Sequence, residues 1–298
     1  MTRKLASKSN LPTPNSFWSQ YINITKKEIK IQIRYPIAFI SSFIQIFMII
    51  LVFTFAAQVF IRQGNQDGLV TSDSLSTYMI LGLMGYLFFG DALNTLGLSL
   101  RNEQTTGTLE TLFLYPVNHI ANLLAKTTWA TFLNIFLTIF GFIVLESLTG
   151  TIQIKFPEII YGLGIFLLYL VQIYGFAFFL SGLNLRLKES VLPLINFLQF
   201  FMLIVAAFFF PYSALGPLVI VSFLIPFSYT IDLMRTIIFG TQPELATIIM
   251  DNFGLGIEVI ILQWFIVIVF TFLLPILGYK YFIKTINDGR ASGSLSDY

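Results

Sequence analysis

Apolar tracts alternate with short polar stretches along most of the chain. A transmembrane helix needs about 20 consecutive, mostly apolar residues. Five tracts of at least that length predict membrane spans, at about residues 37–61, 75–99, 120–145, 159–184 and 257–283. The pattern therefore predicts an all-α integral membrane protein.

A sixth span is predicted within residues 190–231, which contain no charged residue. At about 1.5 Å per residue this segment is long enough for two crossings. A proline inside a helix removes a hydrogen bond and kinks or breaks the helix. We therefore expect one span at about 190–210, then a broken extracellular re-entrant region at 211–256 before the last span. The interrupting residues are Pro193, Pro211, Pro217 and Pro226.

The distribution of basic residues indicates the topology, because cytoplasmic loops carry an excess of Lys and Arg. With a cytoplasmic N-terminus and six spans, 14 of the 17 Lys and Arg residues lie on the cytoplasmic side. A seventh span would place Lys280, Lys284 and Arg290 outside. We therefore expect a plasma membrane protein with six spans in one transmembrane domain, residues 37–284, and a cytoplasmic tail at 285–298.

Two segments precede the first span. Residues 1–16 lack the apolar core of a cleavable signal and predict a disordered cytoplasmic tail. In residues 17–36, aromatic and apolar side chains such as Trp18 alternate with basic ones such as Lys27 and Arg34. This mixture is typical of an amphipathic helix lying in the cytoplasmic membrane interface. The alternative is an ordinary basic flank of the first span.

Composition supports lipid as the main solvent. Only 11% of the 298 residues are charged, whereas a soluble domain has about 25%. The absence of cysteine excludes disulfides and thiolate metal sites, and a single histidine, His119, excludes histidine-rich metal clusters. The chain also lacks a G-x-x-x-x-G-K-[ST] phosphate-binding loop. We therefore expect no catalytic residue, metal or cofactor on this chain.

Residues 101–116, RNEQTTGTLETLFLYP, form a polar stretch between the second and third spans. Asn102 and Thr108 can each cap a helical turn, and Gly107 between them permits a sharp bend. The second turn has one apolar face, made by Leu109, Leu112 and Phe113. The pattern predicts a short cytoplasmic helix at 103–115, which either docks on a partner or packs on its own protein.

This stretch resembles the E-x-x-x-G-T-L-E-x-L-x-x-x-P motif of type-2 ABC exporter permeases. The matching residues are Glu103, Gly107, Thr108, Leu109, Glu110, Leu112 and Pro116. In that family the segment is a coupling helix that docks in a groove of a cytoplasmic ATPase subunit. The resemblance implies that coupling to the ATPase is carried by Glu103, Gly107, Thr108, Leu109, Glu110, Leu112 and Phe113.

A second segment, residues 225–240, is similar to the family element N-P-x-[ST]-Y-x-x-D-x-x-R-x-x-x-x-G. Ile225 replaces the usual Asn, which removes any cap made by that side chain. The candidate re-entrant residues are Tyr229, Asp232 and Arg235. The i, i+3 spacing of Asp232 and Arg235 also predicts a local ion pair.

The resemblance implies a transmembrane subunit that forms a homodimer and pairs with two copies of an ABC-type ATPase. ATP and Mg are then bound by the partner subunit. Such a permease exports drugs, lipids or polysaccharides by alternating access, and the 33 phenylalanines favour a hydrophobic or amphipathic cargo. Membrane lipid is a further expected partner, whereas no nucleic acid is expected.

Asp91 is the one acid deep in a predicted span. An intramembrane carboxylate is costly and marks a functional site by default. Asn94 and Thr95 follow it at i+3 and i+4 and share its helix face. Asp91 and Asn94 are therefore candidate pathway residues, and the alternative is that Asp91 is a hydrogen-bonded structural residue.

Other polar and small residues in the spans predict packing between helices. Three glycines permit close helix approach: Gly82, Gly85 and Gly90. Six uncharged amides are expected to form hydrogen bonds between helices or to face a cavity: Gln45, Asn134, Gln172, Asn196, Gln199 and Gln263. Residues 206–210, AAFFF, either line a hydrophobic path or pack against protein and lipid.

Two other function classes were compared with an ATP-driven exporter. A passive channel or ion-coupled secondary carrier is the main alternative, but a coupled carrier should have more buried acids or a repeat of half the chain. A membrane enzyme needs catalytic groups clustered at one membrane face, and the sequence contains no such cluster. Copurification of an ATPase subunit separates these classes.

Overall fold

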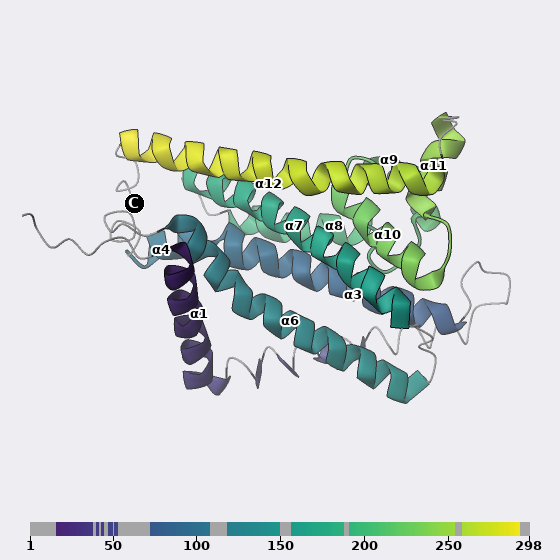
Figure 1. Ribbon diagram of the computed structural model, residues 1–298, viewed down its shortest axis with the longest axis horizontal. Helices are drawn as coiled ribbons and strands as arrows, with labels where there is room; N and C mark the ends of the chain where they lie inside the picture. The colour runs from purple at the N-terminus through teal and green to yellow at the C-terminus, as the bar shows by residue number, and fades with distance from the viewer. Residues whose placement is uncertain are drawn as a thin grey trace, which may run out of the picture.

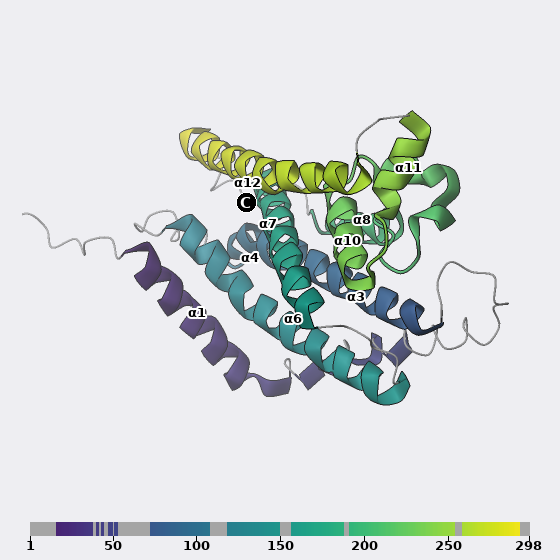
Figure 2. The ribbon, with the colours of Figure 1, turned by 45° about the vertical axis from the view of Figure 1, so that its right-hand side comes forward.

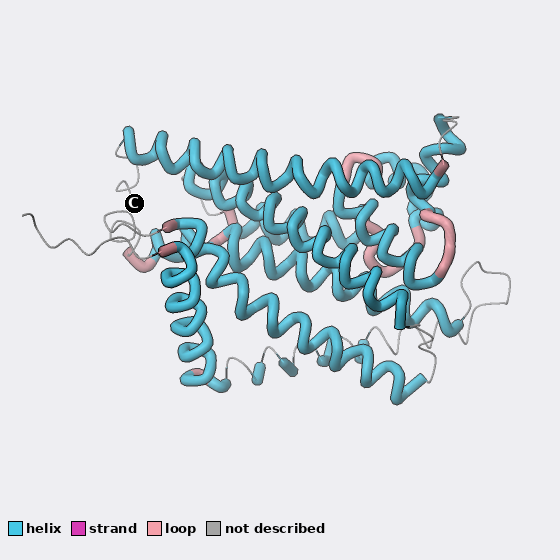
Figure 3. The backbone as a smooth tube through the Cα atoms, in the orientation of Figure 1, coloured by secondary structure: helices cyan, strands magenta, loops and turns pink. Residues whose placement is uncertain are grey.

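All regular secondary structure in the described part of the chain is helical, as the apolar tracts predict (Figure 3). The computed structural model describes residues 16–37, 40–41, 43–44, 47–49, 51–52, 72–107, 118–149, 156–187, 191–253 and 258–292. Most of the first predicted span and nearly all of the N-terminal tail lie outside these residues.

The helices follow the predicted tracts closely. The N-terminal helix is α1 (Phe17–Arg34), and the C-terminal helix is α12 (Val259–Ser292). Between them lie α3 (Ser72–Ala92), the π-helix η1 (Leu93–Gly97), α4 (Ser99–Thr105), α6 (His119–Thr149), α7 (Phe156–Arg186), α8 (Leu192–Val205), the 3-10 helix η2 (Tyr212–Leu218), α9 (Val219–Ser222), α10 (Pro226–Phe239) and α11 (Glu244–Phe253).

Three described helices are long and apolar enough to cross a membrane. The qualifying segments are His119–Phe140 with 22 residues, Pro157–Arg186 with 30 and Val259–Gly289 with 31. Helix α8 has only 14 residues, fewer than the roughly 20 that a bilayer core requires. The count of six spans and the orientation of the termini stay predictions.

The long helices pack along the longest axis of the molecule (Figures 1 and 2). Helix α7 lies against α12 and α3, and α3 lies against α6. The short helices η2, α9, α10 and α11 gather toward one end of this axis, whereas α4 lies at the other end with the C-terminal part of α12 (Figure 1). We call these the outer end, after its predicted side of the membrane, and the α4 end.

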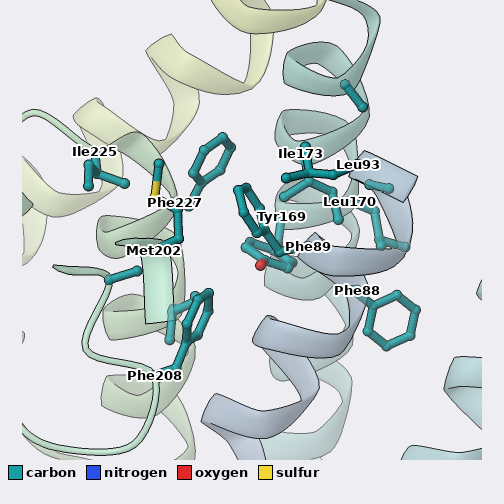
Figure 4. Packing of buried hydrophobic residues seen from close by; sticks show 14 of the residues in the cluster. Phe88, Phe89, Leu93, Tyr169, Leu170, Ile173, Met202, Phe208, Ile225 and Phe227 are labelled. Carbon is teal, nitrogen blue, oxygen red and sulfur yellow. The ribbon is translucent and has the colours of Figure 1, made fainter. Parts of the chain in front are cut away.

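Aromatic side chains from several helices fill the core between α3, α7 and α10 (Figure 4). The Phe89 and Phe227 rings lie 5.4 Å apart between centroids, and Phe88 meets Phe166 edge-on at 4.8 Å. Aromatic pairs in such geometries stabilise a core by about 0.5–1.5 kcal/mol beyond their buried area. The surface of the helix bundle also carries exposed apolar side chains, such as Phe272, which is 67% exposed. Such a surface fits a lipid surrounding.

Two predicted boundaries differ from the structure. Helix α8 ends at Val205, about five residues early, and Ala207 has a φ of 48°. The residues that follow α8 pack inside the protein, and Phe208 is fully buried. Of the two roles predicted for residues 206–210, this burial favours packing against protein for Phe208 over lining a hydrophobic path. Helix α12 continues to Ser292, because buried Ile286 extends its apolar face into the predicted tail.

Candidate functional site

The helix of the second predicted span continues to the α4 end with one break, a single turn residue at Leu98. It passes from α3 through the π-helix η1, which begins directly after Ala92, into α4. A π-turn inserts one extra residue into a helix and is frequent at functional sites. The backbone amide of Asn102 donates to the Leu98 carbonyl at 2.9 Å. The predicted cap at Asn102 is therefore wrong, since helical bonds already satisfy this part of the backbone.

Gly107 terminates α4 with a bend. Its φ is 70°, a left-handed conformation that glycine adopts without steric cost. The Thr105 and Thr106 hydroxyls donate to the Asn102 carbonyl at 3.0 and 2.8 Å. The bend predicted at Gly107 is confirmed. Of the predicted coupling residues, Thr108, Leu109, Glu110, Leu112 and Phe113 lie outside the described residues.

Glu103 on α4 forms an ion pair with Lys126 on α6. The Lys126 Nζ donates to the Glu103 carboxylate at 2.5 Å and to the Ser99 hydroxyl at 3.3 Å. Both charged side chains are largely but not fully buried, with 19% of Lys126 and 24% of Glu103 exposed. Sequence reasoning missed Lys126, because 23 residues separate it from Glu103.

Two contacts attach α1 to the start of α6. The Asn118 side chain caps α6 by accepting from the Ile120 and Ala121 amides at 3.0 and 3.2 Å, and its backbone amide donates to Gln20 at 2.8 Å. Further along, the Tyr21 and Thr128 hydroxyls lie 2.6 Å apart. The predicted amphipathic segment is thus a helix fastened to α6, and its place in the membrane interface stays a prediction.

A polar cavity of about 450 Å³ lies among α1, η1, α4 and α6. Lys27 lines it from α1, Asn94 and Thr95 from η1, and Glu103 and Lys126 from the other two helices. Charges of both signs therefore face one cavity near the α4 end.

Asp91 lies at the junction of α3 and η1. Its carboxylate accepts a hydrogen bond from Thr95 at 3.0 Å, as their shared helix face predicts. Asn94 is exposed and donates to the Gly90 carbonyl at 2.9 Å. Asp91 and Asn94 thus make separate contacts, and both the pathway role and the structural role of Asp91 stay open.

Arg235 on α10 binds the unwound segment after α8. Its guanidinium donates to the Ala207 and Phe208 carbonyls at 2.9 and 2.6 Å. It also donates to the Tyr78 hydroxyl at 2.8 Å, and its Cζ lies 3.6 Å from the centroid of that ring. The carbonyl of Phe208 approaches α3 at Gly82, where a Cβ would lie 1.4 Å from it. A close approach at Gly82 is thus confirmed, but its neighbour is an unwound segment and not the helix that was predicted.

Asp232 binds the start of α11 rather than Arg235. Its carboxylate accepts from the Glu244 and Leu245 amides at 3.3 and 2.9 Å and from the Gln263 side chain at 3.2 Å. In the described residues, Asp232 and Arg235 form no direct ion pair, so the predicted pair is wrong. An α-helix places i and i+3 on one face, but backbone groups of other segments satisfy both side chains here.

Further polar contacts close the outer end. Glu244 accepts from the Tyr212 and Ser213 amides at 2.9 and 2.7 Å and so caps η2. Tyr229 donates its hydroxyl to the Phe223 carbonyl at 2.9 Å. Ile225, the departure from the family motif, provides no side-chain cap for α10, which instead begins with Pro226. Glu244 was missed, since its partners lie over 30 residues away.

Three of the predicted amides form hydrogen bonds between helices in the described part of the chain: Gln172, Gln199 and Gln263. The Gln172 side chain donates to the Val267 carbonyl and to Thr271 at 3.1 and 3.0 Å, and it accepts from Thr230 at 2.8 Å. Gln199 donates to the Gly90 carbonyl at 3.2 Å. These bonds join α7 to α10 and α12, and α8 to α3.

The comparisons with known proteins agree with this architecture. The family model described as ABC-2 family transporter protein matches residues 71–280, which include Asp91, Glu103 and the polar network of the outer end. Searches of the curated proteins and of the solved structures found no match. The chain therefore belongs to the ABC-2 transporter family and is a membrane permease of a type-2 ABC transporter.

Proposed function

We propose that this permease is the membrane-spanning subunit of an ATP-driven exporter. It moves a hydrophobic or amphipathic substrate out of the cytoplasm across the plasma membrane. The family membership supports transport with an ABC-type ATPase. The proposal includes six spans, with both termini and the α4 end in the cytoplasm.

The observation that carries the proposal is the series of successive helices that leads from α3 to the predicted coupling segment. Helices α3, η1 and α4 follow one another, and α4 ends at Thr105, within the predicted coupling segment. In this mechanism a push on residues 103–115 reaches α3 through α4 and η1, which follow it in the chain.

The energy source in this mechanism is a separate subunit. Two ATPase copies bind ATP and Mg and close on each other, and two copies of the permease re-pack between inward-facing and outward-facing states. Asp91 and Asn94 are the candidate pathway residues. The permease itself contributes no catalytic group.

Copurification and reconstitution test the proposal. The permease is purified from its native membrane, and the attached ATPase is reconstituted with it in vesicles. ATP hydrolysis and vesicle uptake are then measured with a panel of fluorescent lipids, hydrophobic dyes and ions. We expect uptake of at least one apolar or amphipathic probe that requires ATP. Uptake that proceeds equally without ATP or the ATPase identifies a channel or carrier and contradicts the proposal.

Two substitutions test the coupling segment. Glu103→Ala and Gly107→Val are expected to leave the permease in the membrane while separating ATP hydrolysis from transport. Wild-type uptake in both variants would show that residues 103–107 do not couple the two activities.

A further inference from the structure

We propose that Lys126 is a positioning residue that transmits movement of α4 to α6 through its ion pair with Glu103. The inference rests on the proposed function, because it assumes that the ATPase moves α4. It adds a residue of the third predicted span to the coupling path.

The geometry links one ammonium group to two successive turns of α4. Lys126 Nζ contacts the Glu103 carboxylate at 2.5 Å and the Ser99 hydroxyl at 3.3 Å. Ser99 is 3% exposed and precedes Glu103 by four residues, so both lie on the same face of α4. Two contacts at different heights restrain the rotation of α4 as well as its position.

The pair lies in the parts of α4 and α6 that are near the predicted coupling segment in the sequence. Helix α4 ends at Thr105, two residues after Glu103, and Lys126 follows the Asn118 cap of α6 by about two turns. Helix α1 is attached to α6 at Asn118 and Thr128, on either side of Lys126. A displacement received by α6 at Lys126 therefore also reaches α1.

Partial burial makes this pair stronger than a surface pair. Exposed ion pairs contribute little to stability because water screens the charges. With only 19% and 24% of the side chains exposed, water screens this pair less. Neutralising one partner leaves the other charge partly buried without its counter-charge, whereas exchanging the two residues restores the attraction.

The absence of cysteine allows a direct test in the intact complex. Single cysteines carrying an environment-sensitive fluorophore are introduced at Thr105→Cys on α4 and at Ile139→Cys on α6, both at exposed positions. The labelled permease with its ATPase is reconstituted in vesicles, and fluorescence is recorded before and after Mg-ATP with vanadate. The backgrounds are wild type, Glu103→Gln, Lys126→Gln and the exchange Glu103→Lys with Lys126→Glu.

We expect both reporters to respond in the wild type. In each single neutralisation the α4 reporter still responds, while the α6 response falls about twofold or more. The exchange restores the α6 response. Lys27→Gln is the matched control, because it removes a positive charge from the same cavity on α1 and should leave both responses intact.

The outcomes separate the two proposals. Silence of both reporters in the wild type contradicts the proposed ATP-driven function. A full α6 response in the single neutralisations, with the wild type responding, overturns only the role of Lys126. A response that is lost in the single variants and not recovered by the exchange also overturns it, since the ion pair is then not what connects the helices.

Discussion

Gly278 on α12 lies directly on the backbone of Gly175 on α7. A Cβ built on Gly278 would lie 2.0 Å from the Gly175 carbonyl oxygen, and one built on Gly175 would lie 2.5 Å from the Pro275 nitrogen. Atoms cannot approach so closely, so any larger residue forces α7 and α12 apart. Small residues allow such close packing in membranes, where van der Waals contact drives helix association.

Gly175→Ala is therefore expected to destabilise the permease by about 1–3 kcal/mol through overpacking. Gly164→Ala is the matched control on the same helix, because a Cβ there meets no atom within 4 Å. That change should be neutral or stabilising by up to about 1 kcal/mol. Unfolding of both variants in detergent is compared, and equal stability would show that α7 and α12 are not in backbone contact.

Arg235→Lys is expected to destabilise the outer end although the charge is kept. The planar guanidinium binds two successive carbonyls and stacks on Tyr78, and an ammonium cannot do all three. We expect a loss of about 1–3 kcal/mol in thermal unfolding experiments. Tyr78→Phe keeps the ring and should cost less. A Lys variant as stable as wild type would show that the two hydrogen bonds from the guanidinium to the Ala207 and Phe208 carbonyls do not stabilise the outer end.

Asp232→Ala is expected to loosen the start of α11. The substitution leaves the Glu244 and Leu245 amides without their acceptor, and a buried unpaired amide costs about 1–3 kcal/mol. Hydrogen exchange at Leu245 should accelerate. The exposed Asp251 on the same helix supplies the control, Asp251→Ala. Unchanged exchange in the Asp232 variant would mean that the cap has no energetic role.

Asp91→Asn distinguishes the two roles of this residue. The amide oxygen of Asn can still accept from Thr95, so the fold should persist while the negative charge is lost. We expect ATP-driven uptake to fall severalfold with the unfolding temperature unchanged. The opposite result, normal uptake with lower stability, assigns Asp91 a structural role.

The local features of the fold were predictable from sequence. The helices α6, α7 and α12 follow from apolar tract length, and the bend at Gly107 follows from one residue's conformational freedom. Each of these signals is contained in neighbouring residues. The predicted break after the fifth span is also local, since Pro211 and Pro226 lie at the starts of η2 and α10.

The side-chain partners were not predictable, because they depend on distant segments. Arg235 and Asp232 are close in sequence, yet Arg235 binds residues 27 and 28 positions before it and Asp232 binds residue 245. Spacing within one helix cannot show which carbonyls and amides other segments present. Lys126 illustrates the same limit, since its partner Glu103 lies 23 residues away on another helix.

The order of the partners along the chain has a consequence for biogenesis. When Arg235 leaves the ribosome, its partners Tyr78, Ala207 and Phe208 have already been made. Asp232 must wait for Leu245 and then for Gln263 on α12. An unfinished chain therefore carries a carboxylate without its full set of hydrogen-bond donors until the last helix arrives. The final helix completes the outer end, and nascent chains stopped before and after Gln263 should differ in protease resistance.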